Sequence, residues 1–280
     1  MIRLTIALLV ALPLFAQSDP LSRSWNQPVE PFRIAGNVWY VGASDIASYL
    51  ITTPKGHILI DGGFVETAPI ILGNIAKLGF EPRDVKILLN SHGHYDHAGG
   101  LAELKRVTGA AFHASRREIP LLARGGLDDP QFGNRFPYPP VEADRIVEHG
   151  TQLRLGGTTL TAHLTPGHTR GCTTWTTTVG EKGKKLDVIF LCSSSVPSSY
   201  RLRGNPLHPD AVEDYRRSFS ILKSLKPEVF LASHGVFFNL TEKRGKKLSF
   251  VDPEGYRNYV ATAEEAFEKR AGNDRSSAVR

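Results

Sequence analysis

One short segment, residues 91–97, places three imidazoles and one carboxylate directly after an apolar run. Its sequence is Ser91-His92-Gly93-His94-Tyr95-Asp96-His97. Neutral imidazole and carboxylate groups are ligands that suit Zn²⁺. Residues 85–90 before it have the apolar character of a short buried strand, and residues 101–107 after it have the apolar spacing of a helix. The sequence thus predicts an α/β fold in which a metal-binding loop joins the end of a strand to a helix.

The spacing within this segment divides its ligands into two pairs. In an extended loop, residues two apart point the same way, so His92 and His94 can share one metal ion. Asp96 and His97 lie beyond the bend and can face a second ion. A His-rich loop exposed to solvent is the alternative, but it would leave two similarly placed histidines further along the chain without an explanation.

Those two histidines, His168 and His234, each follow a strand-like run. His168 comes after the alternating residues 158–164 and a Pro-Gly turn, and His234 follows an apolar run that begins at Val229. Either one alone is weak evidence, because a lone His after a strand is more often an ordinary loop residue. With the segment 91–97 they complete two sets of three ligands, each with an open position for water as catalytic zinc requires: His92, His94 and His168, and Asp96, His97 and His234.

Together these motifs resemble the metallo-β-lactamase superfamily. The H-x-H-x-D-H pattern, Pro-Gly-His-Thr at 166–169 and the strand-terminal His234 carry the resemblance, which extends over residues 31–270. It implies an αββα sandwich of the α/β class, in which two central, mostly antiparallel β-sheets are flanked by helices and a site for two Zn²⁺ ions lies at one edge. Residues 31–37, 167–175 and 213–218 are similar in particular to zinc β-lactamases of class B, third subclass.

The strand predicted at 186–191 separates this subclass from other members of the superfamily. Thioester hydrolases, lactonases and nucleases usually carry a metal-bridging Asp at its end, whereas here it ends in Cys192-Ser193-Ser194-Ser195. The first two β-lactamase subclasses place a zinc-binding Cys near this point. The third subclass has Ser there and uses a His directly after the motif's Asp, as in Asp96-His97. The resemblance aligns Ser193 with that Ser.

The resemblance implies a hydrolase that opens the β-lactam ring of penicillins, cephalosporins and carbapenems by attack of a zinc-bound hydroxide. Asp96 would orient the hydroxide, and Tyr200 would assist the oxyanion. Ser193 and Ser195 have the right chemistry to bind the substrate carboxylate; the alternative for each is a purely structural place at the strand end or in the loop. Two rival functions stay open: hydrolysis of a lactone or thioester, and zinc binding without catalysis.

Two further features near the site allow more than one interpretation. Cys172 and Cys192 would form a disulfide in an exported protein, closing a loop of about 20 residues and stabilising the fold by roughly 3 kcal/mol. The alternatives are two buried free thiols, or Cys192 as a zinc ligand, which His97 makes unnecessary. The loop at about 125–140, rich in Gly, Pro and aromatic residues, forms either one wall of the active-site groove or a surface connection.

The first sixteen residues are typical of a secretory signal peptide. A short basic start precedes an apolar run at residues 4–15, which is too short to span a bilayer, and Ala16 offers a cleavage point, with Ser18 as the second choice. We therefore expect an exported, periplasmic protein. Residues 17–280 would form a single domain with two similar halves that meet near residue 150.

The formal net charge of +6 raises the question of an acidic partner. The basic residues are scattered, apart from two small groups at 182–185 and 243–247. We therefore expect neither a nucleic-acid partner nor a membrane partner, but a monomer that acts on a small β-lactam. A weak attraction for anionic substrates or surfaces follows from the charge alone.

Overall fold

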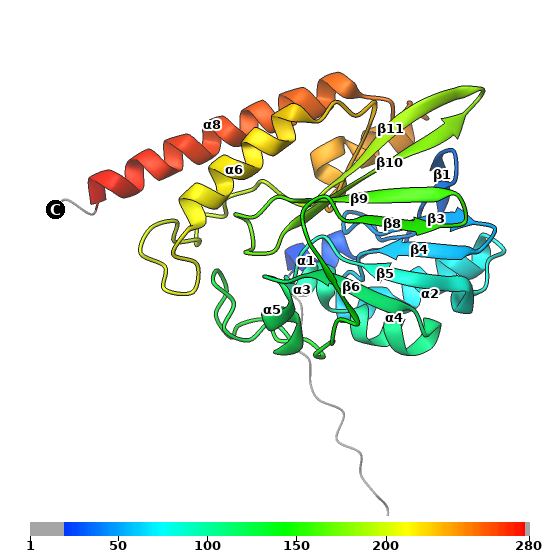
Figure 1. The fold of residues 1–280 in the computed structure, drawn as a ribbon, viewed down its shortest axis with the longest axis horizontal. Coiled ribbons are helices and arrows are strands. Elements are labelled where there is room, and N and C mark those ends of the chain that lie inside the picture. The colour runs from blue at the N-terminus through cyan, green and yellow to red at the C-terminus, as the bar shows by residue number, and fades with distance from the viewer. Residues whose placement is uncertain (1–19, 278–280) are drawn as a thin grey trace, which may run out of the picture.

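The computed structural model describes residues 20–277, in which two β-sheets pack face to face with helices on both outer sides (Figure 1). This layered arrangement confirms the predicted αββα sandwich. The first sheet holds seven strands in chain order: β1 (Phe32–Ala35), β2 (Val38–Tyr40), β3 (Tyr49–Thr53), β4 (Gly56–Ile60), β5 (Val85–Leu89), β6 (Ala111–Ser115) and β7 (Arg145–Val147). The second sheet holds five strands, in the spatial order β12 (Val229–Ala232), β11 (Lys184–Leu191), β10 (Thr173–Glu181), β9 (Thr158–Leu164) and β8 (Gln152–Leu155).

Both sheets mix antiparallel and parallel pairing. Strands β1 to β4 and β8 to β11 are antiparallel, as the resemblance implied, while β4 to β7 and the pair β11 and β12 are parallel. Parallel pairs occur where a helix or a long segment separates consecutive strands, because a parallel partner can be reached only by a long crossover. The chain changes sheet between Val147, which ends β7, and Gln152, which begins β8.

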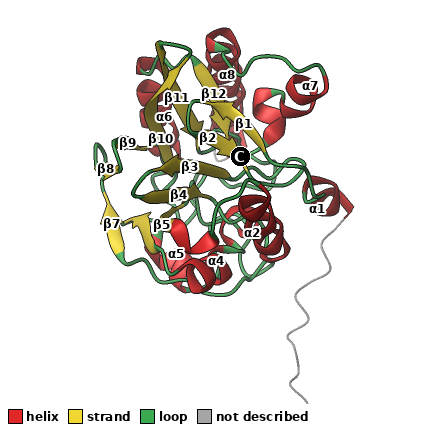
Figure 2. Cartoon of the chain, turned by 90° about the vertical axis from the view of Figure 1, so that its right-hand side faces the viewer, coloured by secondary structure: helices red, strands yellow, loops and turns green. Residues whose placement is uncertain are grey.

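Helices cover the outer faces of the two sheets (Figure 2). Helices α2 and α4 pack on the first sheet, and α6 and α8 lie together over the second. Helix α4 confirms the predicted helix and ends at Gly109, whose φ of +69° is the left-handed conformation that commonly ends helices. The helices are α1 (Pro20–Trp25), α2 (Ala68–Lys77), α3 (Tyr95–Ala98), α4 (Leu101–Thr108), α5 (Ile119–Ala123), α6 (Ala211–Ser224), α7 (Leu240–Gly245) and α8 (Pro253–Ser277), with 3₁₀ turns η1 (Val65–Thr67), η2 (Pro82–Asp84) and η3 (Gly235–Phe238).

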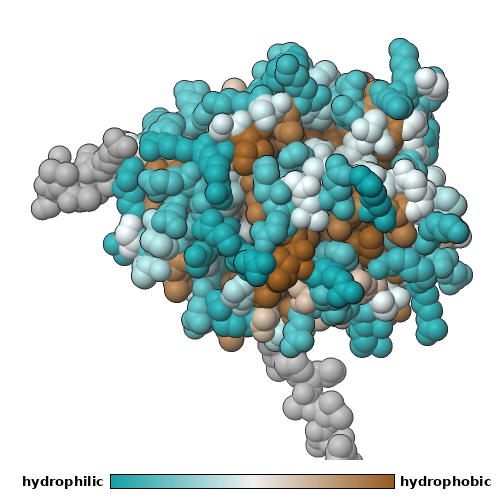
Figure 3. Space-filling model, in the orientation of Figure 1, coloured by the Kyte–Doolittle hydropathy of each residue, from teal (hydrophilic) through white to brown (hydrophobic). Residues whose placement is uncertain are grey.

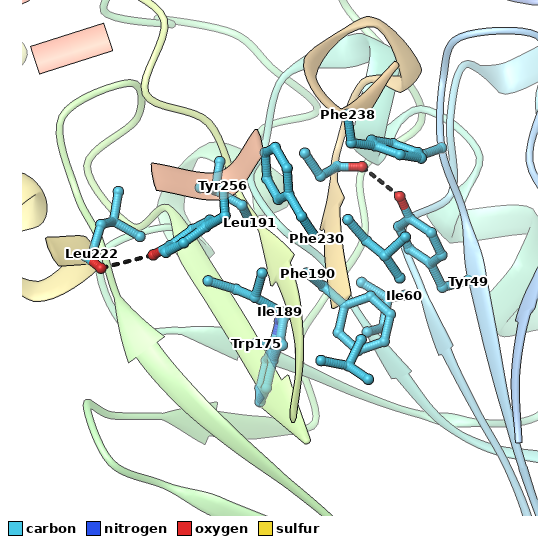
Figure 4. Packing of buried hydrophobic residues seen from close by; sticks show 14 of the residues in the cluster. Tyr49, Ile60, Trp175, Ile189, Phe190, Leu191, Leu222, Phe230, Phe238 and Tyr256 are labelled. Atoms are coloured by element: carbon cyan, nitrogen blue, oxygen red, sulfur yellow. Dashed lines mark hydrogen bonds between the residues drawn. The ribbon is translucent and has the colours of Figure 1, made fainter. Parts of the chain in front are cut away.

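Alternation of side chains along the central strands builds two apolar cores. In β3, Tyr49 and Ile51 face the second sheet, whereas Leu50 faces α2 and α4. Between the sheets, Tyr49 packs against Phe190 with ring centroids 5.0 Å apart, and the Tyr49 hydroxyl donates to the Ala232 carbonyl at 2.6 Å (Figure 4). This core fixes the relative position of the two sheets, and with it the loops at their edges.

Four strands end at the same edge of the sandwich. Strands β11 and β12 run in parallel, and β9 runs in the same direction because both β9 and β11 are antiparallel to β10. The amide of Thr173 donates to the carbonyl of Ser91 at 2.8 Å, which brings the end of β5 to this edge as well. Each of these four strands leads into a loop that carries predicted site residues. The opposite edge holds the tight β10–β11 turn at Lys182 and Gly183.

The predicted signal peptide, residues 1–16, lies outside the described residues. Among the residues that the structure describes, no helix combines the length and apolar character needed to cross a membrane. The face shown in Figure 3 is largely hydrophilic, with apolar side chains in separate patches between charged ones.

Candidate metal centre

The three histidines of the first predicted set converge at the edge where β5 and β9 end. His92 and His94 come from the loop after β5, and His168 comes from the loop after β9. All three are buried, and their ligand atoms lie within 4.8 Å of one another. The ring centroids of His92 and His168 are 4.8 Å apart. The structure thus brings together residues that are more than 70 positions apart in the sequence.

The second set, Asp96, His97 and His234, is packed more tightly. Nε2 of His97 lies 3.1 Å from Nε2 of His234. Oδ2 of Asp96 lies 3.5 Å from His97 Nε2 and 3.4 Å from His234 Nε2. A tetrahedral zinc ion about 2.0–2.1 Å from each ligand places ligand atoms roughly 3.4 Å apart. These three atoms therefore fit a single metal ion.

Three of the five histidines have an oxygen within hydrogen-bond distance of Nδ1, whereas His94 and His97 have only a carboxylate oxygen 3.5 and 3.8 Å from one ring nitrogen. Partners of this kind orient metal ligands and fix their tautomer. The buried Nε2 of His92 has no hydrogen-bond partner among the described residues, as expected for an atom reserved for a metal. The pairs are His92 Nδ1 with Ser91 Oγ (2.9 Å), His94 Nε2 with Asp129 Oδ2 (3.5 Å), His97 Nδ1 with Asp61 Oδ2 (3.8 Å), His168 Nδ1 with the Ser195 carbonyl (2.9 Å) and His234 Nδ1 with Asp45 Oδ2 (2.8 Å).

Burial keeps the first set in the protonation state that binds metal. Burial, together with nearby imidazoles, holds the pKa of His92 well below its ordinary value and lowers the pKa of His94 to about 4 and that of His168 to about 3. Neutral imidazoles carry a free lone pair, so a cation can bind without first displacing a proton.

The carboxylate between the histidines of the second set is ionised. Burial alone would raise the pKa of Asp96, but the attraction and hydrogen bonds of His97 and His234 outweigh it and hold that pKa well below the usual range. Burial lowers the pKa of His234, yet hydrogen bonds to Asp45 and Asp96 raise it to about 9. A cation that bound Nε2 of His234 would have to displace the proton from that nitrogen.

A buried carboxylate, Glu118, joins the two loops that carry the first set. Its Oε1 accepts the Gly93 amide at 2.5 Å, and its Oε2 accepts the Gly171 amide at 2.6 Å and the Thr169 hydroxyl at 3.0 Å. Burial raises the pKa of Glu118 to about 7 in spite of these three hydrogen bonds. A Cβ at Gly93 would lie 2.9 Å from Oε1, so glycine is needed for this close approach.

Sequence analysis missed Glu118, and it also missed Asp45 and Asp129. The three acids lie in separate parts of the chain, and none stands in a recognisable spacing with the ligands. The available signal was a pair of glycines, Gly93 between two ligands and Gly171 three positions after His168, because a glycine at such a place often marks a close backbone approach.

The predicted substrate-binding residues take different places. Ser193 is buried at the end of β11, with its hydroxyl 3.1 Å from that of Ser195. Ser195 contacts a predicted ligand, since its carbonyl accepts from His168. Tyr200 differs from the expectation, because its side chain is fully buried and its hydroxyl is hydrogen bonded to Nδ1 of His208 at 2.5 Å. In this conformation the Tyr200 hydroxyl is not presented to a substrate, and we withdraw its assignment to the oxyanion.

The two cysteines form the predicted disulfide. Cys172 and Cys192 are bonded, with their Cα atoms 5.9 Å apart, and both are fully buried. Their sulfurs lie near His92, but a disulfide sulfur carries no thiolate and is not a zinc ligand. The pairing therefore excludes both alternatives, free thiols and Cys192 as a ligand.

The aromatic loop at 125–140 reaches the metal centre. Phe132 packs edge-on against His94 with centroids 4.9 Å apart. Phe136 stacks on Tyr95 at 4.2 Å. On the other side, Trp25 of α1 lies 5.3 Å from His234. The site is therefore bordered by aromatic rings on both sides, and the loop forms one wall of it.

Comparisons with known proteins agree with this geometry. Residues 41–234 match the family model described as the metallo-beta-lactamase superfamily. A curated relative, the N-acyl homoserine lactonase AttM of Azorhizobium caulinodans, is 30% identical over 154 residues, which cover 44% of this chain and 56% of that protein. The chain thus spans little more than half the length of this relative.

Solved structures match over most of the chain. The native FEZ-1 metallo-beta-lactamase from Legionella gormanii superposes with a TM-score of 0.86 at 40% identity, covering 89% of this chain and 98% of that one. BJP-1, a subclass B3 metallo-beta-lactamase of Bradyrhizobium japonicum, superposes with a TM-score of 0.84 at 38% identity, covering 91% and 98%. The fold, the metal-ligand cluster and the matched family model lead to one conclusion: the chain belongs to the metallo-β-lactamase superfamily.

Proposed function

We propose that this protein is a zinc-dependent hydrolase that opens the β-lactam ring of penicillins, cephalosporins and carbapenems. The observation that carries the proposal is the second ligand set, in which His97 directly follows Asp96 while the strand before Ser193 ends without an Asp. Identity of 40% to a metallo-β-lactamase over 89% of the chain supports it. We assign one Zn²⁺ to His92, His94 and His168, and a second to Asp96, His97 and His234.

Different residues of the chain have different roles in the proposed reaction. Two bound zinc ions would supply a water of lowered pKa and a Lewis acid for the carbonyl oxygen. Asp96, ionised and buried between His97 and His234, would accept a hydrogen bond from such a water and so orient it. Ser193 and Ser195 offer hydroxyl donors to a substrate carboxylate. The aromatic rings of Phe132 and Trp25 border the site and would contact a bound substrate.

Lactone hydrolysis is the second candidate, because curated lactonases are among the relatives. A substrate panel separates the two. We expect kcat/KM for a penicillin, a cephalosporin and a carbapenem to exceed that for an acyl homoserine lactone and a thioester by orders of magnitude. A panel in which the lactone or the thioester is the best substrate would overturn the assignment.

Replacement of Ser193 by alanine is expected to raise KM for several β-lactams with little change in kcat. The hydroxyl would contact the substrate carboxylate in the ground state and in the transition state alike, so its loss weakens binding uniformly. A hydrogen bond to a charged group contributes about 1.5–3 kcal/mol, which corresponds to roughly 10-fold or more in KM. Steady-state kinetics measure this, with the exposed Ser199→Ala in the same loop as the control. An unchanged KM would remove Ser193 from substrate binding.

We further propose that residues 1–16 are a signal peptide and that residues 17–280 act as a periplasmic monomer. The apolar run at 4–15 followed by Ala16 supports this proposal. Mass spectrometry of the protein recovered from the periplasm tests it. A chain that retains Met1 there would contradict the cleavage, and a larger particle in solution would contradict the monomer.

A further inference from the structure

The fold brings together the two basic groups that are about 60 residues apart in the sequence. Lys182 of the β10–β11 turn and Lys247, which follows α7, line the same groove of about 620 Å³. Residues of strand β1 and of the segment 247–251 also line this groove. Sequence analysis identified the two groups but predicted no membrane partner, because nothing in their spacing indicates that the turn and the segment meet.

The groove carries an excess of positive charge that its own acids do not neutralise. Its two acidic residues are already paired, Glu181 with Arg33 at 2.7 Å and Glu30 with Lys77 at 2.6 Å. Among the described residues, no carboxylate lies within salt-bridge distance of the groove's remaining exposed lysines or of Arg244. Lys182, Lys247 and Arg244 thus lack a carboxylate partner among the described residues, although the Arg244 guanidinium lies over the Phe32 ring, 5.1 Å from its centroid. The exposed Lys184 and Lys185 follow Lys182 in the chain.

Apolar side chains are exposed among these cations. Leu248 is 47% exposed and Val251 is 43% exposed, one and four positions after Lys247 in the chain. Phe32 and Phe250, which line the same groove, stack with ring centroids 5.7 Å apart. A surface that combines lysines with exposed aliphatic side chains matches the headgroup region of an anionic bilayer, where lysines meet phosphates and aliphatic groups reach the acyl boundary.

This surface lies at the end of the molecule opposite the metal centre. Strand β10 begins at Thr173, whose amide bonds to Ser91 beside the ligands, and ends at Glu181 next to the basic turn. Nine residues of β-strand span about 30 Å. In Figure 1 the β10–β11 turn and β1 accordingly lie at the far end of the sheets from α3 and α5. A surface bound here leaves the metal centre open to soluble substrates.

We propose that this basic and apolar groove docks the protein on the surface of an anionic phospholipid bilayer. The contact is peripheral, since the helices described do not span a membrane. Nucleic acid would also attract lysines, but two exposed aliphatic side chains that line the same groove favour lipid over a phosphodiester backbone. The proposal goes beyond hydrolysis and does not depend on it.

Co-sedimentation with vesicles tests the proposal. We expect the protein to bind vesicles of phosphatidylcholine with phosphatidylglycerol, to bind pure phosphatidylcholine vesicles weakly, and to be released by high salt. A triple variant, Lys182→Gln, Lys184→Gln and Lys247→Gln, is expected to lose about fivefold in affinity for each lysine, on the order of 100-fold in all. A double variant, Leu248→Ser with Val251→Ser, keeps the lysines but removes the exposed aliphatic groups. At intermediate salt, where the electrostatic attraction is partly screened, we expect this variant to bind the anionic vesicles more weakly than the wild type does.

A second triple variant provides the matched control. Lys55→Gln, Lys226→Gln and Lys269→Gln remove the same charge from exposed positions outside the groove. Equal loss of binding in both triple variants would overturn the proposal, because net charge alone would then explain the attraction. Absence of vesicle binding, or binding of duplex DNA in its place, would also overturn it. Hydrolysis of a soluble β-lactam should be the same in both variants, so failure of docking is distinguishable from failure of the proposed function.

Discussion

Replacement of His234 by alanine is expected to remove one of two bound zinc ions and to lower kcat/KM for β-lactams by more than about 100-fold. Loss of a partner that merely orients a ligand typically costs 10–100-fold, so loss of a ligand costs more. The change leaves Asp96 and His97 as the ligands of the second set, and two side chains hold zinc poorly. Elemental analysis of the purified variant gives the metal content, and steady-state kinetics give the activity.

His163→Ala is the matched control for this variant. His163 is a half-buried imidazole of the same sheet, on β9, and its Nε2 is 2.9 Å from the Thr176 hydroxyl, outside the ligand cluster. The His163→Ala variant should keep both zinc ions and near-normal turnover. Normal hydrolysis and normal zinc content in the His234 variant would refute the second ligand set.

Replacement of Glu118 by alanine is expected to weaken both the fold and the metal centre. Three buried donors, the amides of Gly93 and Gly171 and the Thr169 hydroxyl, lose their acceptor. A buried donor left without a partner costs about 1–3 kcal/mol, and the three losses are not additive, so we expect a decrease of about 3–5 kcal/mol in the free energy of unfolding. Zinc affinity should fall by roughly 10–100-fold, because the loops of His92 and His168 lose their connection.

A structural role alone would change stability without changing metal affinity, so the two are measured separately. Urea unfolding of the zinc-loaded and zinc-free protein gives stability, and competition with a chromophoric chelator gives affinity. Glu118→Gln keeps one acceptor oxygen and should lie between the wild type and the alanine variant in both measurements. The exposed Glu142→Ala should change neither. Wild-type zinc affinity in Glu118→Ala would show that Glu118 does not position the ligands.

The ligands could be predicted from the sequence because their chemistry is concentrated and local. His92, His94, Asp96 and His97 lie within six consecutive positions between a strand and a helix, and that arrangement alone indicates a metal-binding loop. The prediction of His168 and His234 as ligands required one further observation, which is that each follows a strand. Strands of one sheet that run in the same direction end at the same edge, so their loops meet.

The residues that support the ligands could not be predicted in this way. Asp45 follows β2 and reaches His234 across 189 positions of sequence. Such a contact depends on how the two sheets pack, and no local sequence pattern around either residue indicates it. The buried position of Tyr200 could not be predicted for a related reason. Its hydroxyl is hydrogen bonded to His208, and no sequence motif marks that histidine. The basic groove likewise exists only because a turn of the second sheet folds beside the segment after α7.

Carbapenem hydrolysis by the purified protein, with a chelator and then with zinc restored, tests the central claim most directly. We predict turnover that the chelator abolishes and added zinc recovers, with two zinc ions bound per chain at full activity. Turnover that persists in the metal-free protein, or its absence in zinc-replete protein, would contradict the assignment of this site as a zinc-dependent β-lactam hydrolase.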